Sequence, residues 1–362
     1  MFTSRCKTCL LPENYPNESF NEDHICSFCQ GKRRFGVQQD PTIQDQMKHR
    51  ERFAEEFNET MRSLKGTYSY DCLVPLSGGK DSAYLAYLLK ESYGLHILGL
   101  TIDNGFLGPL AKQNVEHIVE VLDIDHIFLT PHETFFTTLY GYNLKHPKFY
   151  QDSYEEIGFL STVCHACTDA MHSIMVEYAF RYQIPCVALA YAPDQIEYHF
   201  YQIRNEYLRT HAWYPRGMKT ESFSDEDRRI LWDPAHHDLE RDSVVPTVFF
   251  PFHVLPYPGS NEIQAVLRDK DILKKGKGHP VKTNCILNYL LVYLDMKKLG
   301  YNPLTPGISY QIRQGLYKKR DWFFFFTGIE FLVKTGVYRN ILMKKPFDVI
   351  LKQLQLRLED IL

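Results

Sequence analysis

The sequence has no long apolar run and no excess of charge of either sign. No stretch reaches the ~20 apolar residues that a membrane-spanning helix needs. The formal net charge of the 362-residue chain is −3, which excludes a polycation that binds nucleic acid or membranes through charge alone. The segment Met1–Cys6 contains no apolar core of a signal peptide. We therefore expect a soluble, cytoplasmic protein with no membrane partner.

Disulfides are also not expected, because cysteines in a reducing compartment favour metal or redox chemistry. Two CxxC pairs near the N-terminus are separated by 16 residues. This spacing is typical of a structural zinc ribbon, in which four thiolates hold one tetrahedral Zn²⁺ and leave no open position for catalysis. Four unrelated free thiols are the alternative. The expected zinc ligands are Cys6, Cys9, Cys26 and Cys29.

A glycine loop lies between a strand pattern and a helix pattern. Residues 71–76 form a short apolar run, and residues 83–90 have the pattern of a helix. Between them, Ser77-Gly78-Gly79 allows a tight turn that presents free N–H groups at a helix N-terminus, and Lys80 adds a full charge. The earlier glycine of the Walker motif is missing. These features favour a phosphate site, and an ordinary glycine turn is the alternative.

Strand and helix patterns alternate from residue 71 to about residue 200, which predicts an α/β fold with a doubly wound parallel sheet. Ligands of such sheets bind outside the carboxyl ends of the strands. Asp103 and Asp194 each follow a predicted strand and are candidates for the nucleotide site, although Asp103 also suits a turn before Asn-Gly. Further strands are expected at 96–102, 126–129 and 185–190, and helices at 110–122, 170–182, 284–298 and 346–362.

The chain is expected to divide into four segments, with a helical domain at its C-terminal end. The charged and aromatic stretch 202–245 suits a solvated insertion, or a substrate or RNA surface. The expected segments are a zinc ribbon (1–40), an amphipathic connecting helix (41–66), a nucleotide domain (67–235) and a C-terminal helical domain (236–362).

The six residues from Ser77 to Ser82 resemble the PP-loop, S-G-G-x-D-S, of the ATP pyrophosphatase superfamily. The resemblance implies a HUP-like sheet and an enzyme that splits ATP between the α- and β-phosphates. AMP passes to a substrate oxygen, Mg²⁺-bound pyrophosphate leaves, and a nucleophile then displaces AMP. The residues that the resemblance places on ATP are Ser77, Gly78, Gly79, Lys80, Asp81 and Ser82, with Lys80 and Asp81 also catalytic.

A second cysteine pattern consists of Cys164-His165-Ala166-Cys167 and a lone Cys285 in a Gly- and Lys-rich stretch. It resembles the iron–sulfur PP-loop enzymes that 2-thiolate tRNA, in which three such cysteines hold a catalytic [4Fe–4S] cluster beside ATP. The resemblance implies one iron without a protein ligand, open to sulfide. The residues alone also permit a redox or persulfide pair, a zinc site completed by His165 or His279, or buried apolar thiols.

The ribbon and the glycine loop together, over roughly the first 130 residues, resemble the N-acetyl sugar amidotransferases. That resemblance implies that ammonia from a glutaminase partner is added to an adenylated acetamido group. We favour an ATP-dependent sulfur transferase that acts on a small molecule or an RNA base with a separate sulfur donor, and a homodimer is compatible with the sequence. A non-catalytic RNA adaptor is the third hypothesis, and the intact loop argues against it.

Overall fold

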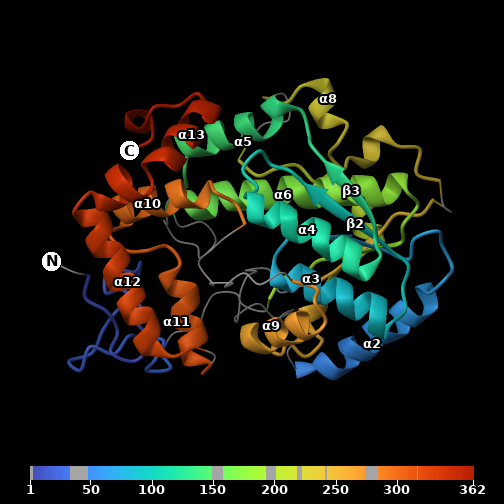
Figure 1. Cartoon of the computed structure of the whole chain (residues 1–362). Coiled ribbons are helices and arrows are strands. Elements are labelled where there is room, and N and C mark those ends of the chain that lie inside the picture. Colours follow the sequence, from blue (N-terminus) through green and yellow to red (C-terminus); the bar gives the residue numbers. More distant parts are fainter. Residues whose placement is uncertain are drawn as a thin grey trace. The chain divides into compact units, whose positions relative to one another are not determined.

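The computed structural model describes residues 3–32, 48–148, 158–192, 201–217, 222–240, 243–273, 284–315 and 317–362 (Figure 1). The chain forms two compact units, and each is assembled from segments that are distant in sequence. The helical unit consists of Met1–Asp40, Thr137–His165 and Ile286–Leu362, and the sheet unit consists of Pro41–Phe136 and Ala166–Cys285. Among the described residues, no helix has the length and apolar character needed to cross a membrane.

The sheet unit is built on a six-stranded sheet with the order β3-β2-β1-β4-β6-β5. All neighbouring strands are parallel except β5, which runs antiparallel to β6. The predicted α/β class with a mainly parallel sheet is therefore confirmed, whereas the short strands β5 and β6 were not predicted. The strands are β1 (Cys72–Pro75), β2 (Ile97–Ile102), β3 (Asp125–Leu129), β4 (Cys186–Ala188), β5 (Gln202–Ile203) and β6 (Thr247–Phe249).

The strand order reverses beside β1. Strands β2 and β3 lie on one side of it, and β4 and β6 lie on the other. In open sheets of this kind, ligands bind outside the carboxyl ends of the strands at the point of reversal. Strand β1 ends at Pro75, two residues before the glycine loop. The topology therefore places the predicted phosphate site where such a sheet binds its ligands.

Strands and helices of the sheet unit share one core. All six residues of β2 are buried, which accounts for its mainly apolar sequence; the hydroxyl of Thr101 donates to the carbonyl oxygen of Leu76. Helix α2 (Arg50–Leu64), which lies in the predicted connecting segment, buries Phe57 and Met61. The remaining helices of this unit are α3 (Lys80–Tyr87), α4 (Pro109–Leu122), α7 (Asn205–Leu208), α8 (Asp225–Arg228) and α9 (Ser260–Asp269).

Helix α6 (Gly158–Arg181) begins well before the predicted start at residue 170. The cysteine pair at 164 and 167 is therefore inside the helix and not in front of it. The cause is distant in sequence: the buried carboxylate of Asp295 accepts the N–H groups of Phe159 at 2.6 Å and Leu160 at 2.8 Å. These are donors of the first helical turn, which have no partner within the helix.

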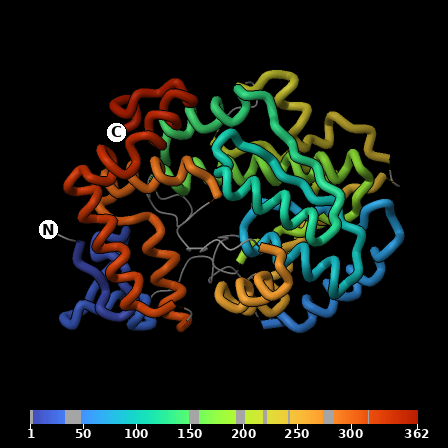
Figure 2. The backbone as a smooth tube through the Cα atoms, viewed as in Figure 1, coloured from blue at the N-terminus to red at the C-terminus, as the bar shows by residue number. Residues whose placement is uncertain are grey.

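The helical unit combines the N-terminal ribbon with the C-terminal helices, and Figure 2 shows the blue ribbon beside these orange and red helices. Buried Tyr15, Phe28 and Tyr301 pack around the ribbon cysteines. The predicted tail helix ends early, at Leu354, where Gln355 takes a left-handed conformation (φ 54°). The helices are α10 (Asn288–Leu299), α11 (Thr305–Arg313), α12 (Lys319–Lys334) and α13 (Lys344–Leu354), while α5 (Glu133–Lys145) and α6 run through both units.

Candidate functional site

The glycine loop joins β1 to α3, whose N-cap is Gly79. Gly78 has a left-handed φ of +72°, and a Cβ atom there would lie 2.2 Å from the carbonyl oxygen of Ala111. Two hydroxyls support the turn: Ser82 Oγ accepts the N–H of Ser77 at 3.3 Å, and Ser77 Oγ accepts the N–H of Gly79 at 3.3 Å. The loop therefore has a fixed shape that requires glycine at position 78.

The two charged residues of the loop meet each other. Lys80 Nζ lies 2.7 Å from both carboxylate oxygens of Asp81. The hydroxyl of Tyr257 donates to Asp81 Oδ1 at 2.7 Å and accepts from Lys80 Nζ at 3.1 Å. A bound phosphate can replace Asp81 as the partner of Lys80, and a bound cation can replace Lys80 as the partner of Asp81, because both charges lie beside the loop. Sequence reasoning missed Tyr257, which is 176 residues from Asp81 and has no local signal.

Asp103 follows β2 and is nearly buried. Its Oδ2 pairs with Lys112 Nζ at 2.5 Å, and its Oδ1 accepts the N–H of Gly105 at 3.0 Å. The second contact stabilises a turn, which is the alternative role that the sequence indicated for Asp103. A role toward the nucleotide stays a prediction. Asp194, the other acidic candidate, lies outside the described residues.

The structure brings two of the three distant cysteines to one side chain. The amide nitrogen of Asn104 lies 3.7 Å from Cys285 Sγ and 4.0 Å from Cys167 Sγ. Cys285 forms an antiparallel bridge with Leu107, and the side chain of the preceding Asn284 donates to the carbonyl oxygen of Ser77 at 2.8 Å. Cys285 is therefore linked to the glycine loop through the residue that precedes it.

Cys164 lies one helical turn before Cys167 on α6, in the helical unit. Its Sγ is 3.8 Å from Asn288 Oδ1, at the start of α10. Within the described ranges, no set of three possible metal ligands that includes Cys167 and Cys285 lies within 4.8 Å of one another. His279, one possible ligand of the zinc alternative, lies outside the described residues. Both thiols are partly exposed, which argues against a purely apolar role. That Cys164, Cys167 and Cys285 together hold one iron–sulfur cluster stays a prediction.

The four N-terminal cysteines form a compact cluster, with all four sulfurs within 4.8 Å of one another. Backbone N–H groups of Thr8 and Cys26 each lie 3.4 Å from Cys6 Sγ. Hydrogen bonding to the neighbouring thiols, that of Cys26 foremost, lowers the pKa of Cys9 to about 7. Four convergent thiols with amide donors are the donor set that a structural zinc ion takes.

Arg313 of α11 contacts this cluster. Its Nη1 donates to Cys9 Sγ at 3.1 Å, and its guanidinium lies 5.0 Å from the ring centroid of Phe28. The positive charge of Arg313 therefore lies beside the sulfurs of the ribbon, 304 residues away in sequence.

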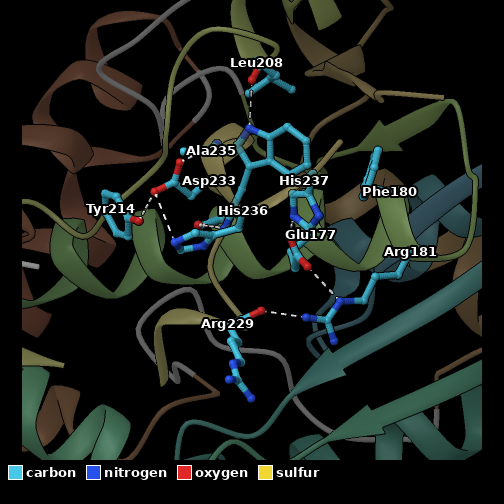
Figure 3. A network of polar contacts seen from close by, with 12 residues as sticks. Glu177, Phe180, Arg181, Leu208, Tyr214, Arg229, Asp233, Ala235, His236 and His237 are labelled. Atoms are coloured by element: carbon cyan, nitrogen blue, oxygen red, sulfur yellow. Dashed lines mark hydrogen bonds and ion pairs between the residues drawn. The ribbon is translucent and has the colours of Figure 1, made fainter. Parts of the chain in front are cut away.

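A network on α6 holds the charged stretch after β5 (Figure 3). Glu177, which is 1% exposed, accepts from Arg181 Nε at 2.7 Å and pairs with His237 Nε2 at 2.8 Å. The indole of Trp232 stacks on His237 and donates to the carbonyl oxygen of Leu208 at 3.0 Å. These charges serve to attach the segment to α6.

A second polar group on α6 lies near the end of β4. Burial lowers the pKa of His172 to about 4, and its Nε2 lies 2.8 Å from the hydroxyl of Tyr191. One turn earlier, Asp169 pairs with Arg216 through Nε at 2.7 Å and Nη2 at 3.2 Å. Sequence reasoning did not single out His172, Asp169 or Tyr191, because their pairing depends on the fold.

Comparison with known proteins gives weak similarities. No family model matches the sequence. An uncharacterised protein of Methanocaldococcus jannaschii is 31% identical over 80 residues, which are 22% of this chain, and the chain spans only 29% of that protein's length.

Three solved structures resemble parts of the fold. An NMN synthetase from Francisella tularensis matches with 18% identity and a TM-score of 0.29, over 40% of this chain and 56% of its own. An NH3-dependent NAD synthetase from Campylobacter jejuni matches with 12% identity and a TM-score of 0.29, over 40% and 58%. The U34-tRNA thiolase NcsA from Methanococcus maripaludis, with its [4Fe-4S] cluster, matches with 15% identity and a TM-score of 0.34, over 87% of each chain. Similarities of this size carry no conclusion about chemistry.

Proposed function

We propose that this protein is an AMP-forming ATP pyrophosphatase that adenylates a carbonyl oxygen of its substrate and then replaces that oxygen with sulfur. The observation that carries the proposal is the bond from Asn284 to the carbonyl oxygen of Ser77. It links Cys285 to the glycine loop, and the thiol of Cys167 lies near the same Asn104 amide as Cys285. This bond supports the proposal, because it links a loop suited to binding phosphate with a thiol suited to handling sulfur.

The loop residues have separate tasks in this proposal. The N–H groups at the start of α3 face the phosphates of ATP, where the helix dipole favours negative charge. Lys80 exchanges its contact with Asp81 for a phosphate oxygen, and the carboxylate of Asp81 would hold Mg²⁺, a cation that prefers oxygen ligands. The shape imposed by Gly78 keeps the backbone close enough for these contacts.

The reaction takes place in two displacements. The substrate carbonyl oxygen attacks the α-phosphorus, the bond from that phosphorus to the bridging oxygen breaks, and pyrophosphate leaves. Sulfide then adds to the activated carbon, and AMP departs with the original oxygen, so that a thiocarbonyl remains. Adenylation converts a poor leaving group into a good one, and Mg²⁺ neutralises the charge of the departing pyrophosphate.

Two metal groups belong to the proposal. Cys164, Cys167 and Cys285 would hold a [4Fe–4S] cluster, which supplies an iron position open to sulfide. The N-terminal cluster, Cys6 with its three partners, would hold a structural Zn²⁺.

A small-molecule substrate suits the charges better than RNA does. Three basic side chains after β5 are occupied within the protein: Arg216 pairs with Asp169, Arg204 pairs with Glu56, and Arg209 donates to backbone carbonyls. They therefore do not provide a basic surface for a phosphate backbone. A separate sulfur donor is the expected partner.

Product analysis and a lysine pair test the nucleotide chemistry. ATP should yield AMP and pyrophosphate, whereas ADP and phosphate would contradict the proposal. Lys80→Ala removes a charge-assisted contact worth roughly 1.5–3 kcal/mol, so ATP should bind about 10- to 100-fold more weakly. Lys90→Ala is the matched control, because Lys90 interacts with Asp123 outside the loop. An equal loss of affinity in both variants would count against the assigned role of Lys80.

The transferred atom is tested with anaerobically purified protein. Iron and sulfide should be present together with zinc, and a thiocarbonyl product should form when sulfide is supplied. Colourless, iron-free protein that turns over with ammonia would replace sulfur transfer with amidotransfer to an acetamido sugar, which is the reaction that the N-terminal resemblance implies.

A further inference from the structure

We propose that Asn104 is a positioning residue that directs both hydrogens of its amide nitrogen at the sulfurs of Cys167 and Cys285. It thereby orients the two thiolates and adjusts the negative charge that they present to a bound metal group. The identity of that group rests on the proposed function, but the pairing of Asn104 with two sulfurs does not. No sequence motif assigns a role to this residue.

The orientation of the amide follows from its other end. Asn104 Oδ1 accepts the backbone N–H of Phe106 at 2.9 Å, so the oxygen is committed to the turn after β2. An asparagine amide has one acceptor end and one donor end, and the assignment of the two ends is decided by such contacts. The NH2 group must therefore face away from Phe106, where the sulfurs lie at 3.7 Å and 4.0 Å.

Three separate elements meet at this amide. Asn104 follows β2, Cys167 belongs to α6, and Cys285 is held by its bridge to Leu107. Since Asn104 is 7% exposed, water reaches its side chain poorly. A buried amide hydrogen without an acceptor is costly, so the arrangement favours sulfurs that carry negative charge. Thiolates bound to a metal meet this requirement better than neutral thiols do.

Two consequences follow for a bound group. Outer-shell hydrogen bonds orient metal ligands, and their loss typically weakens binding by about 10- to 100-fold. Hydrogen bonds to the sulfurs also adjust the reduction potential of an iron–sulfur cluster. Removing the donors should make the potential more negative, because the reduced cluster carries more charge and gains more from each hydrogen bond.

The sharpest variant is Asn104→Asp, which retains the shape and the acceptor for Phe106 but replaces the NH2 group with an oxygen. Asn104→Ser keeps one shorter donor. The matched control is Asn143→Asp, because Asn143 is also buried but donates to the carbonyl oxygen of Leu139 and not to sulfur. Circular dichroism and nucleotide binding verify that each variant is folded.

In iron-loaded protein, the midpoint potential should decrease in the order wild type, Asn104→Ser, Asn104→Asp, while Asn143→Asp stays at the wild-type value. If Asn104 had a purely structural role, its substitution would lower the iron content without producing this order of midpoint potentials. Equal potentials in wild type and Asn104→Asp, at equal iron content, would overturn the proposal.

A second measurement works without iron. Phenylarsine oxide is added to iron-free Cys164→Ser protein whose N-terminal cysteines are occupied by zinc. Cys167 and Cys285 are then the pair of thiols under test. The arsenic bonds to both sulfurs, and its oxygen leaves as water with the two thiol protons. Asn104→Asp should weaken this binding by about tenfold or more. Binding as tight as in the Cys164→Ser parent, or an equal loss with Asn143→Asp, would overturn the role of Asn104. Iron-free protein that still shows the tenfold effect would instead overturn the cluster and leave Asn104 in place.

Discussion

The pH dependence of stability should reveal the buried carboxylate of Asp295. This residue of α10 is fully buried, and burial raises its pKa from 3.8 to about 7, even though the N–H groups of Phe159 and Leu160 act in the opposite direction. In the unfolded chain its pKa returns to the ordinary value. The folded protein therefore holds a proton at pH 5 that the unfolded chain has lost.

The sign and size of the effect follow from proton linkage. Stability falls with rising pH wherever the folded state binds more protons, so this contribution is fully present below pH 4 and is lost as the pH rises through about 7. One pH unit inside this window corresponds to about 1.4 kcal/mol. Between pH 5 and pH 8, Asp295 should therefore lower the free energy of unfolding by about 2–3 kcal/mol.

Urea unfolding of wild type and Asp295→Asn at several pH values isolates this term. Asparagine resembles the protonated acid, so the variant should match wild type only below about pH 4. It should be about 1–2 kcal/mol more stable than wild type at pH 5 and about 4 kcal/mol more stable at pH 8. Asp348→Asn, which removes an exposed carboxylate of α13, controls for net charge. A difference that does not vary with pH would refute the reasoning. If Asp295→Asn is less stable than wild type at pH 8, the two N–H hydrogen bonds to the carboxylate outweigh the cost of its burial.

Two further substitutions test the loop and the ribbon. Gly78→Ala places a Cβ 2.2 Å from the carbonyl oxygen of Ala111, so the loop must shift and ATP binding should be lost. The control is Gly141→Ala in the middle of α5, where a Cβ would have no neighbour within 4 Å. This variant should preserve ATP binding and stabilise the helix by up to about 1 kcal/mol. Equal ATP affinity in both variants would contradict the fixed loop. Cys9→Ser should release zinc and, because Arg313 contacts Cys9, should increase hydrogen exchange in α11 as well as in the ribbon. If hydrogen exchange increases only in the ribbon, the metal site does not stabilise the C-terminal helices.

Local features of the fold were predictable because their signals lie within a few neighbouring residues. The apolar run before Ser77 and the glycines after it predict a strand and a tight turn, and the structure has β1 and a loop with a left-handed Gly78. The spacing of the N-terminal cysteines likewise predicts the cluster that they form. The parallel sheet followed from alternating periodicities, although β5 and β6 are too short to give a period.

The contacts that complete the candidate site depended on the tertiary structure. Tyr257 reaches Asp81 across 176 positions, and Asn104 reaches Cys285 across 181. Asp295 lengthens α6 by capping a helix that begins 137 residues earlier, at Gly158. No periodicity or motif connects such pairs, because each partner has an ordinary local sequence. They meet only when the sheet and the helices have packed, and burial then decides which polar groups must bond to each other.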